Sequence, residues 1–228
     1  LKRELRGQAF LPTISVHPLF HILSTIHGEV SRRVAQRAAS EKYVTTGGHV
    51  FGAGEERSSM IFVVAGSLCY NYTVNKTNMT EVIEEGHWAN ESVLWLAECP
   101  PVSPFVAEVD SDLVLINGAE FRRLAASCHH ESLGLVRYAD FFVKDIGDQI
   151  AACPEQGAIF NDMLYVKDRA DKAFASYLHA MRHSFGHGNF MSRLSNHMLT
   201  GRISETMNGA VSTVSMESPS GSTPRNDK

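Results

Sequence analysis

Long apolar runs, paired cysteines and a signal region are all missing from this sequence. No stretch of its 228 residues approaches the roughly 18 consecutive apolar residues of a membrane-spanning helix, so we expect no direct membrane insertion by this segment. The four cysteines form no CxxC pair, which argues against a zinc cluster and favours the reduced thiols of a cytoplasmic protein. Leu1 stands where an initiator Met would, and we read the sequence as a piece of a longer chain.

Arginine is absent from the middle of the sequence. Between residues 58 and 121, Lys76 is the only basic residue against nine acidic ones, which gives this segment a charge of −8. Both flanking segments are mildly basic, so the net charge of −4 hides a strong asymmetry. An acidic segment of this kind repels nucleic acid and anionic lipid. We therefore expect no nucleic-acid partner.

The order of hydrophobic patterns predicts helices at both ends and strands between them. Apolar residues at three- and four-residue steps predict a helical region over residues 19–34, with a break near His27 and Gly28. Short β-rich runs separated by turn residues follow at residues 43–45, 60–64, 67–74, 80–83, 105–109 and 113–116, and residues 89–96 suit a short helix. Helical periodicity returns at residues 120–127, at 131–152 and, as one long helix, from 160 to about 184.

These patterns predict an α+β fold, in which an antiparallel, jelly-roll-like β-roll carries an N-terminal helical arm and C-terminal closing helices. We assign residues 1–16 to the end of a linker, 17–152 to the roll domain, 153–200 to a helical extension and 201–228 to a disordered tail. The apolar stripe of the extension is either core or a partner surface, and assembly into a tetramer would be the natural use of such a surface.

Several residues within this pattern resemble those of cyclic-nucleotide-binding domains. Residues 86–94 are similar to the phosphate-binding cassette of that family. The other matching positions are Pro18-Leu19-Phe20, Gly48, Val50-Phe51, Gly54-Glu55, residues 60–64, Gly66-Ser67-Leu68, Phe121 and Leu124. Residues 1–5 and the helix leading into Pro18 resemble the end of the C-linker of voltage-gated cation channels of the hyperpolarisation-activated, plant potassium and ether-à-go-go types. The resemblance implies a regulatory domain in which a closing helix, residues 131–152 here, moves over the roll when a ligand binds.

The resemblance places the candidate ligand-binding residues in two short segments, residues 90–93 and 105–107. In the family, a Gly-Glu pair opens the cassette and the glutamate accepts the ribose 2′-hydroxyl. Glu91 matches that glutamate, while Asn90 replaces the glycine. Asparagine tolerates left-handed backbone angles, so the turn can survive. Ser92 and Val93 would then present backbone amides to a phosphate.

The arginine that pairs with the phosphate in the family has no counterpart. The matching motif is Pro104-Phe105-Val106-Ala107, with Phe105 where the arginine belongs. A charge-assisted phosphate contact contributes on the order of a few kcal/mol, so we expect weak or no binding of cAMP or cGMP. Either Phe105 or Trp95 could fill the empty pocket, or both rings simply pack in the core.

Catalytic and metal chemistry find less support. His179, His183 and His187 recur at four-residue steps, but no glutamate completes an HExxH motif and glycines flank His187. A cupin-like metal barrel could use His87 and Glu91 but would lack its second histidine, and no GxSxG motif is present. We therefore predict neither an enzyme nor a metal site, and no cofactor beyond a weakly bound cyclic nucleotide.

By resemblance, the sequence predicts the cytoplasmic regulatory domain of a membrane ion channel, a potassium channel among the candidates. Its partners would be the remainder of a larger channel chain and, in a homotetramer, further copies of itself. Two alternatives stay open. One is a regulatory module that binds cAMP or cGMP, as in kinase regulatory subunits or transcription factors. The other is an interaction scaffold without a ligand.

Overall fold

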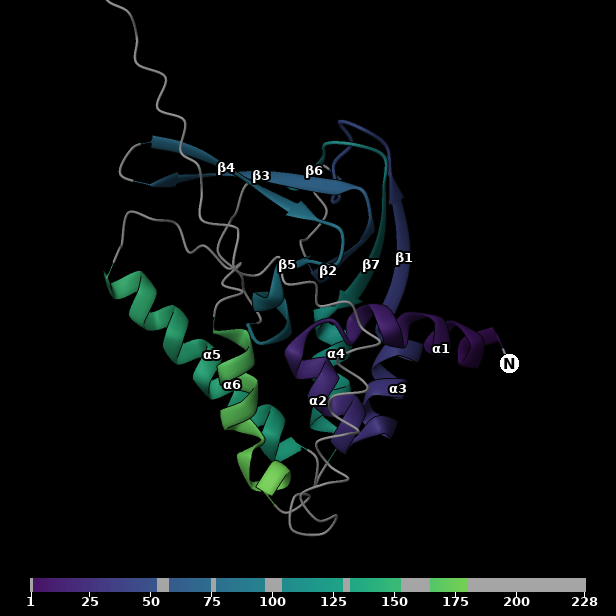
Figure 1. Ribbon diagram of the computed structural model, residues 1–228, viewed down its shortest axis with the longest axis vertical. Coiled ribbons are helices and arrows are strands. Elements are labelled where there is room, and N and C mark those ends of the chain that lie inside the picture. The colour runs from purple at the N-terminus through teal and green to yellow at the C-terminus, as the bar shows by residue number, and fades with distance from the viewer. Residues whose placement is uncertain are drawn as a thin grey trace, which may run out of the picture.

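A computed structural model describes residues 2–52, 58–74, 77–96, 104–128, 132–152 and 165–179. Figure 1 shows a roll of strands in the upper half and helices gathered below it. The fold is α+β, an antiparallel β-roll flanked by helices, as the sequence predicts. The tail expected at residues 201–228, most of the extension at 153–200, and His183 and His187 lie outside the described residues.

Three helices form the N-terminal arm: α1 (Lys2–Ile14), α2 (Pro18–Ile26) and α3 (Gly28–Arg37). Pro18 suits the first turn of α2, where a backbone N–H is not needed. His17 caps this helix, because its Nδ1 accepts a hydrogen bond from the backbone N–H of Leu19 at 3.2 Å. His27 ends α2 and precedes α3, which confirms the predicted break.

Two antiparallel sheets form the roll, one in the order β1-β7-β2-β5 and the other in the order β4-β3-β6. Gly66, with φ 90°, makes the turn from the first sheet to the second, and a Cβ atom there would lie 2.6 Å from the carbonyl oxygen of Asp110. The strands are β1 (Ala39–Val44), β2 (Ser59–Ala65), β3 (Ser67–Val74), β4 (Thr77–Glu84), β5 (Trp88–Ala89), β6 (Val106–Ala107) and β7 (Ser111–Asn117).

Strand positions largely follow the predicted runs. β3 spans the predicted residues 67–74, whereas the run at 105–109 forms only the short strand β6. β1 begins earlier than residue 43, because Ala39 already pairs with Ile116 of β7. Charged Glu41 and Lys42 on this edge strand hide its strand character from the apolar pattern. The short helix expected at residues 89–96 is a 3-10 helix, η1 (Glu91–Leu94), that follows β5.

After the roll come α4 (Gly118–Ala126), α5 (Ser132–Ala152) and α6 (Val166–Ala173). The prediction of one continuous helix from residue 160 to 184 is wrong within the described residues, because the helix is interrupted at Phe174 and resumes at residues 175–179. Phe174 is fully buried against α5, and a Cβ atom on Gly134 would lie 2.2 Å from its ring. This insertion of the ring against α5 accompanies the break.

Two buried apolar clusters divide the interior. One fills the roll and includes Tyr70 and Phe105. The other lies between the roll and the helices and includes Phe62, Trp88 and Tyr138. α6 contributes Val166, Ala170 and Ala173 to this second cluster. Of the described residues of the predicted stripe, Phe174 belongs to the cluster, and Tyr177 and Leu178 are partly buried against it. Across the described ranges, none of the helices combines the length and the apolar character that crossing a bilayer requires.

Candidate functional site

Asn90 makes a left-handed turn directly before η1. Its φ of 63° and ψ of 37° place it in the left-handed region, and it is the one non-glycine residue with positive φ among those described. The side chain is buried, and its Nδ2 donates to the carbonyl oxygen of Ser59 in β2 at 2.9 Å. Asn90 therefore holds the glycine-like backbone and also ties the cassette to the first sheet.

The cassette helix η1 is held at its C-terminal end by α4. Arg122 donates to the carbonyl oxygen of Val93 and, at 3.1 Å, to that of Leu96. A guanidinium at this end satisfies carbonyl groups that a short helix leaves unpaired. Gly118 makes the close approach of α4 to η1 possible, because a Cβ atom there would lie 2.2 Å from the carbonyl oxygen of Val93.

Within η1, the buried hydroxyl of Ser92 has no hydrogen-bond partner among the described residues.

Glu91 lies at the centre of a buried polar network, with only 3% of its surface exposed. Its Oε1 accepts hydrogen bonds from the Tyr138 hydroxyl at 2.7 Å and from Trp95 Nε1 at 3.2 Å. Its Oε2 lies 3.2 Å from His17 Nε2. Because His17 Nδ1 already accepts a hydrogen bond from a backbone N–H, the ring N–H is at Nε2, which donates a hydrogen bond to Glu91 Oε2. Three elements thus converge on one carboxylate.

The protein stabilises the charged form of Glu91. Burial alone raises the pKa of this carboxyl, but the interactions with His17, the hydrogen bond from Tyr138 and the charge of Arg169 together hold the pKa below its usual value of 4.5. The same burial, together with the carboxylate, raises the pKa of Tyr138 well above its usual value, so its hydroxyl stays a donor. A buried carboxylate needs such partners, because an unpaired charge is strongly disfavoured in the interior.

Phe105 lies inside the roll and is 4% exposed. Its ring centroid is 5.3 Å from that of Tyr70 and 6.5 Å from that of Phe51. Val106 pairs with Cys69, and Ala107 pairs with Leu68, so β6 continues the second sheet. The side chain of Phe105 is therefore in an apolar environment, with two aromatic rings beside it.

The other candidate filler, Trp95, lies on the helix side of the roll rather than inside it. Its ring centroid is 5.4 Å from Phe121 and 5.1 Å from Tyr138. The structure thus separates the predicted site residues. Phe105 and Ala107 belong to the roll interior, whereas Val93 belongs to the core between roll and helices, near the Glu91 network.

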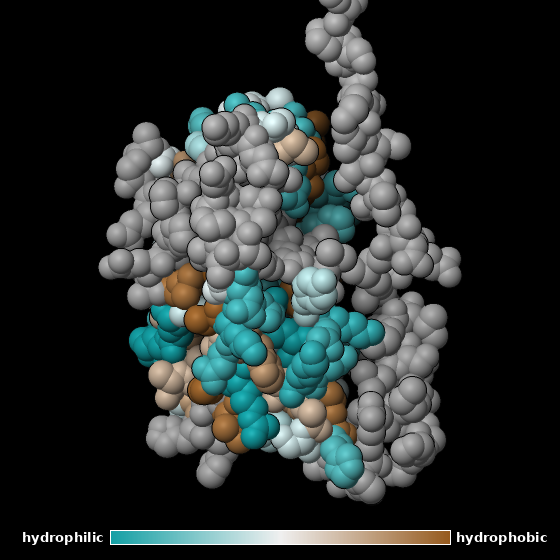
Figure 2. Space-filling model, turned by 90° about the vertical axis from the view of Figure 1, so that its left-hand side faces the viewer, coloured by the Kyte–Doolittle hydropathy of each residue, from teal (hydrophilic) through white to brown (hydrophobic). Residues whose placement is uncertain are grey.

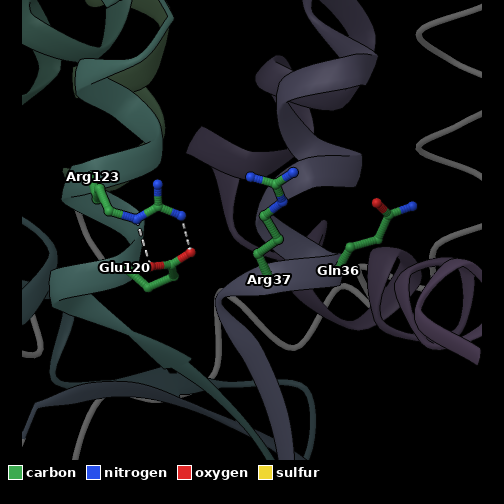
Figure 3. A pocket seen from close by; sticks show the side chains of 4 residues that line it. All are labelled: Gln36, Arg37, Glu120 and Arg123. Carbon is green, nitrogen blue, oxygen red and sulfur yellow. Dashed lines mark hydrogen bonds and ion pairs between the residues drawn. The ribbon is translucent and has the colours of Figure 1, made fainter.

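A surface hollow of about 410 Å³ lies elsewhere, between α3 and α4, and contains none of the predicted site residues. Figure 3 shows Arg37 and Gln36 on one side of it and Glu120 and Arg123 on the other. Arg123 Nε lies 2.8 Å from Glu120 Oε2, and its hydrogen bonds, with the charge of Arg37, hold the pKa of Glu120 below its usual value. The Glu120 carboxylate is thus already paired with a residue of the hollow, and the residues that line the hollow are not those of the predicted site.

Sequence reasoning missed the partners of Glu91. His17 precedes a helix-starting proline, which marks the beginning of a helix, but histidine is not among the usual N-cap residues, so its buried position was not signalled. Tyr138 lies on the apolar stripe of α5, where a buried tyrosine needs a partner for its hydroxyl. Arg169 lies far along the chain, and no local pattern in the sequence pointed to it.

No protein-family model and no curated protein sequence matches the chain. Solved structures do. The sensor domain of the transcriptional regulator DNR from Pseudomonas aeruginosa is 18% identical, covers 64% of this chain and 93% of its own, and has a TM-score of 0.48. The regulatory domain of Toxoplasma gondii PKA, solved with cAMP, is 18% identical over 63% of this chain, with a TM-score of 0.46. The C-linker/CNBHD of zELK channels, crystallised in the presence of cAMP, is 18% identical over 50% of this chain, with a TM-score of 0.40. This chain spans 51% of the PKA structure and 55% of the channel structure.

Proposed function

We propose that this chain is a cyclic-nucleotide-binding-like regulatory domain of an ion channel whose phosphate site no longer accepts a cyclic nucleotide. The observation that carries the proposal is the placement of Phe105. Its buried ring stands, by resemblance, where a guanidinium would pair with the phosphate. An apolar, aromatic site cannot offset the desolvation of a phosphate anion.

The charges of the roll also disfavour the binding of a phosphate. Residues 58–121 contain no arginine, one lysine and nine acidic residues. A charge-assisted contact to phosphate contributes about 1.5–3 kcal/mol, or roughly a factor of 10 to 150 in affinity. The repulsion of a phosphate by the acidic roll lowers the affinity further.

The ribose side of the site is also engaged. Glu91, which by resemblance would accept the ribose hydroxyl, already accepts hydrogen bonds from Tyr138, Trp95 and His17. A ligand would have to displace at least one of these donors. We infer that contacts within the protein hold α5 over the cassette, a role that a ligand has in the family.

The channel context rests on the N-terminal arm. The segment that resembles the end of a C-linker forms α1, whose Phe10 and Ile14 are buried in the core between roll and helices. Movement of the roll domain would therefore be transmitted directly to the preceding chain. In this proposal the partners are the remainder of a channel chain and, in a homotetramer, further copies.

Titration of the whole 228-residue chain with cAMP and cGMP tests the proposal. Calorimetry gives the affinity, and tryptophan fluorescence reports on the site independently, because Trp95 donates to Glu91. We expect no saturation at millimolar ligand, with 5′-AMP as the control for non-specific binding. Micromolar affinity for either cyclic nucleotide would refute the loss of the ligand and favour the kinase-type alternative.

The sequence upstream of Leu1 separates the channel context from the others. Six apolar spans with a regularly spaced arginine series are the expected finding. A non-membrane domain in that place, or a second tandem roll, would instead support a regulatory subunit or a scaffold.

A further inference from the structure

Arg169 of α6 is buried although it carries a charge. Among the described residues, Glu91 and Arg169 are the Asp, Glu, Lys and Arg side chains that are buried, at 3% and 4% exposure. Burial of a guanidinium is unfavourable unless the protein supplies partners. The contacts of Arg169 therefore show which neighbouring element α6 is built to hold.

These contacts lead to α5. Arg169 Nε donates to Asp145 Oδ2 at 2.9 Å. The guanidinium carbon lies 4.9 Å from the ring centroid of Phe142 and 5.7 Å from that of Tyr138, both within the range of a cation–π interaction. One side chain of α6 thus contacts three residues of α5, spread over two turns of that helix.

Through Tyr138 the contact continues to the cassette. The ring of Tyr138 lies beside Arg169, and its hydroxyl donates to Glu91 of η1. The charge of Arg169 also contributes to the lowered pKa of Glu91. The series Arg169, Tyr138, Glu91 therefore connects α6, α5 and the cassette through contacts of side chains alone.

α6 also has the properties of an element that can be released. It spans eight residues, and a helix of that length is unstable in water without tertiary contacts. Its outer side carries the exposed residues Lys167, Asp168, Asp171 and Lys172. Figure 2 looks onto the side of the molecule that carries α5 and α6, where hydrophilic side chains cover much of the described surface. Docking of α6 thus depends on its buried side, where Arg169 supplies the one buried charge.

We propose that α6 is an internal latch that holds the closing helix α5 on the cassette in place of a ligand, with Arg169 as its anchoring side chain. The role of α5 as a closing helix rests on the proposed function. Undocking of α6 would remove the cation beside Tyr138 and the partner of Asp145, and α5 would separate from η1. An event that displaces α6 would then act on this domain as release of the ligand acts in the family that the sequence resembles.

Hydrogen exchange of backbone amides in the whole chain, without ligand, tests the latch. Arg169→Met keeps an unbranched side chain but removes the charge. We expect exchange of the α5 amides to become at least tenfold faster, while the amides of β2 and β7 keep their protection. The matched control is Lys172→Ala, which removes a cation of the same helix that is 62% exposed and pairs with Asp168 within α6. This control should leave α5 unchanged.

Asp145→Asn provides a second variant, because it weakens the same contact from the α5 side at a carboxylate that is 41% exposed. We expect a smaller acceleration of exchange, again confined to α5. Equal loss of protection in α5 and in the roll would refute the latch, since Arg169 would then be an ordinary part of the core. Unchanged α5 protection in Arg169→Met would refute it as well. Micromolar binding of a cyclic nucleotide would overturn the proposed function. The latch would still be decided by the exchange of the α5 amides measured without ligand.

Discussion

Removal of the Tyr138 hydroxyl tests whether the Glu91 network stabilises the fold as its geometry indicates. In Tyr138→Phe the ring remains, with its contacts to Trp95 and Arg169, so little apolar packing is lost. The hydroxyl bond to Glu91 Oε1, 2.7 Å long and buried on both sides, disappears. A hydrogen bond to a buried charge contributes about 1.5–3 kcal/mol, and since two donors to Glu91 remain we expect a loss of about 2 kcal/mol.

Urea denaturation followed by tryptophan fluorescence measures this loss. With an m-value of about 2 kcal/mol/M, the midpoint should fall by about 1 M while m stays constant. Tyr43→Phe is the matched control, because the Tyr43 hydroxyl donates to Asp110 at 2.8 Å on the protein surface. We expect no measurable shift there, since water replaces the lost bond. Equal shifts in the two variants would refute the argument that burial makes the Tyr138 bond strong.

Two further predictions concern the same region. Because the folded pKa of Glu91 lies below 4.5, its contribution to stability is complete above that pH and falls as the pH drops toward the folded pKa. Glu91→Gln should therefore flatten the pH dependence of the free energy of unfolding between about pH 5 and pH 3, and unchanged slopes would contradict this assignment. Gly118→Ala should destabilise the fold by about 1–3 kcal/mol, because its Cβ would lie 2.2 Å from the Val93 carbonyl oxygen. Gly28→Ala, with nothing within 4 Å of the new Cβ, should keep or raise the Tm, and similar losses in both would count against a tight contact between α4 and the cassette.

Local patterns in the sequence predicted the elements of the fold well. The strand at residues 67–74 and the break at His27 depend on neighbouring residues, and each is found as expected. The left-handed angles at Asn90 are ones that asparagine tolerates, but the sequence did not decide whether the turn forms. The interruption at Phe174 was missed, because it accompanies packing against Gly134 of another helix rather than a local breaker. Local periodicity cannot report such a contact.

The site was predictable only in part, because its contacts also join residues that lie far apart in the sequence. Resemblance identified Glu91 and Phe105, but not what surrounds them. The hydrogen bonds to Glu91 from His17 and Tyr138 join residues 74 and 47 positions apart in the chain. Burial of a glutamate depends on such distant partners, and a single sequence without related sequences gives no measure of their proximity.

The buried carboxylate also fixes where α5 can sit along its own axis. The apolar stripe of α5, with Leu135, Tyr138 and Phe142 buried, repeats every three to four residues, so a shift by one turn of about 5.4 Å would bring similar side chains to the same surface. Such a shift would carry the Tyr138 hydroxyl out of reach of Glu91 and leave the charge with fewer donors. An apolar seam alone would tolerate several alignments of the helix. Glu91 makes one of them uniquely favourable, and so acts as a reference point for the assembly of the domain.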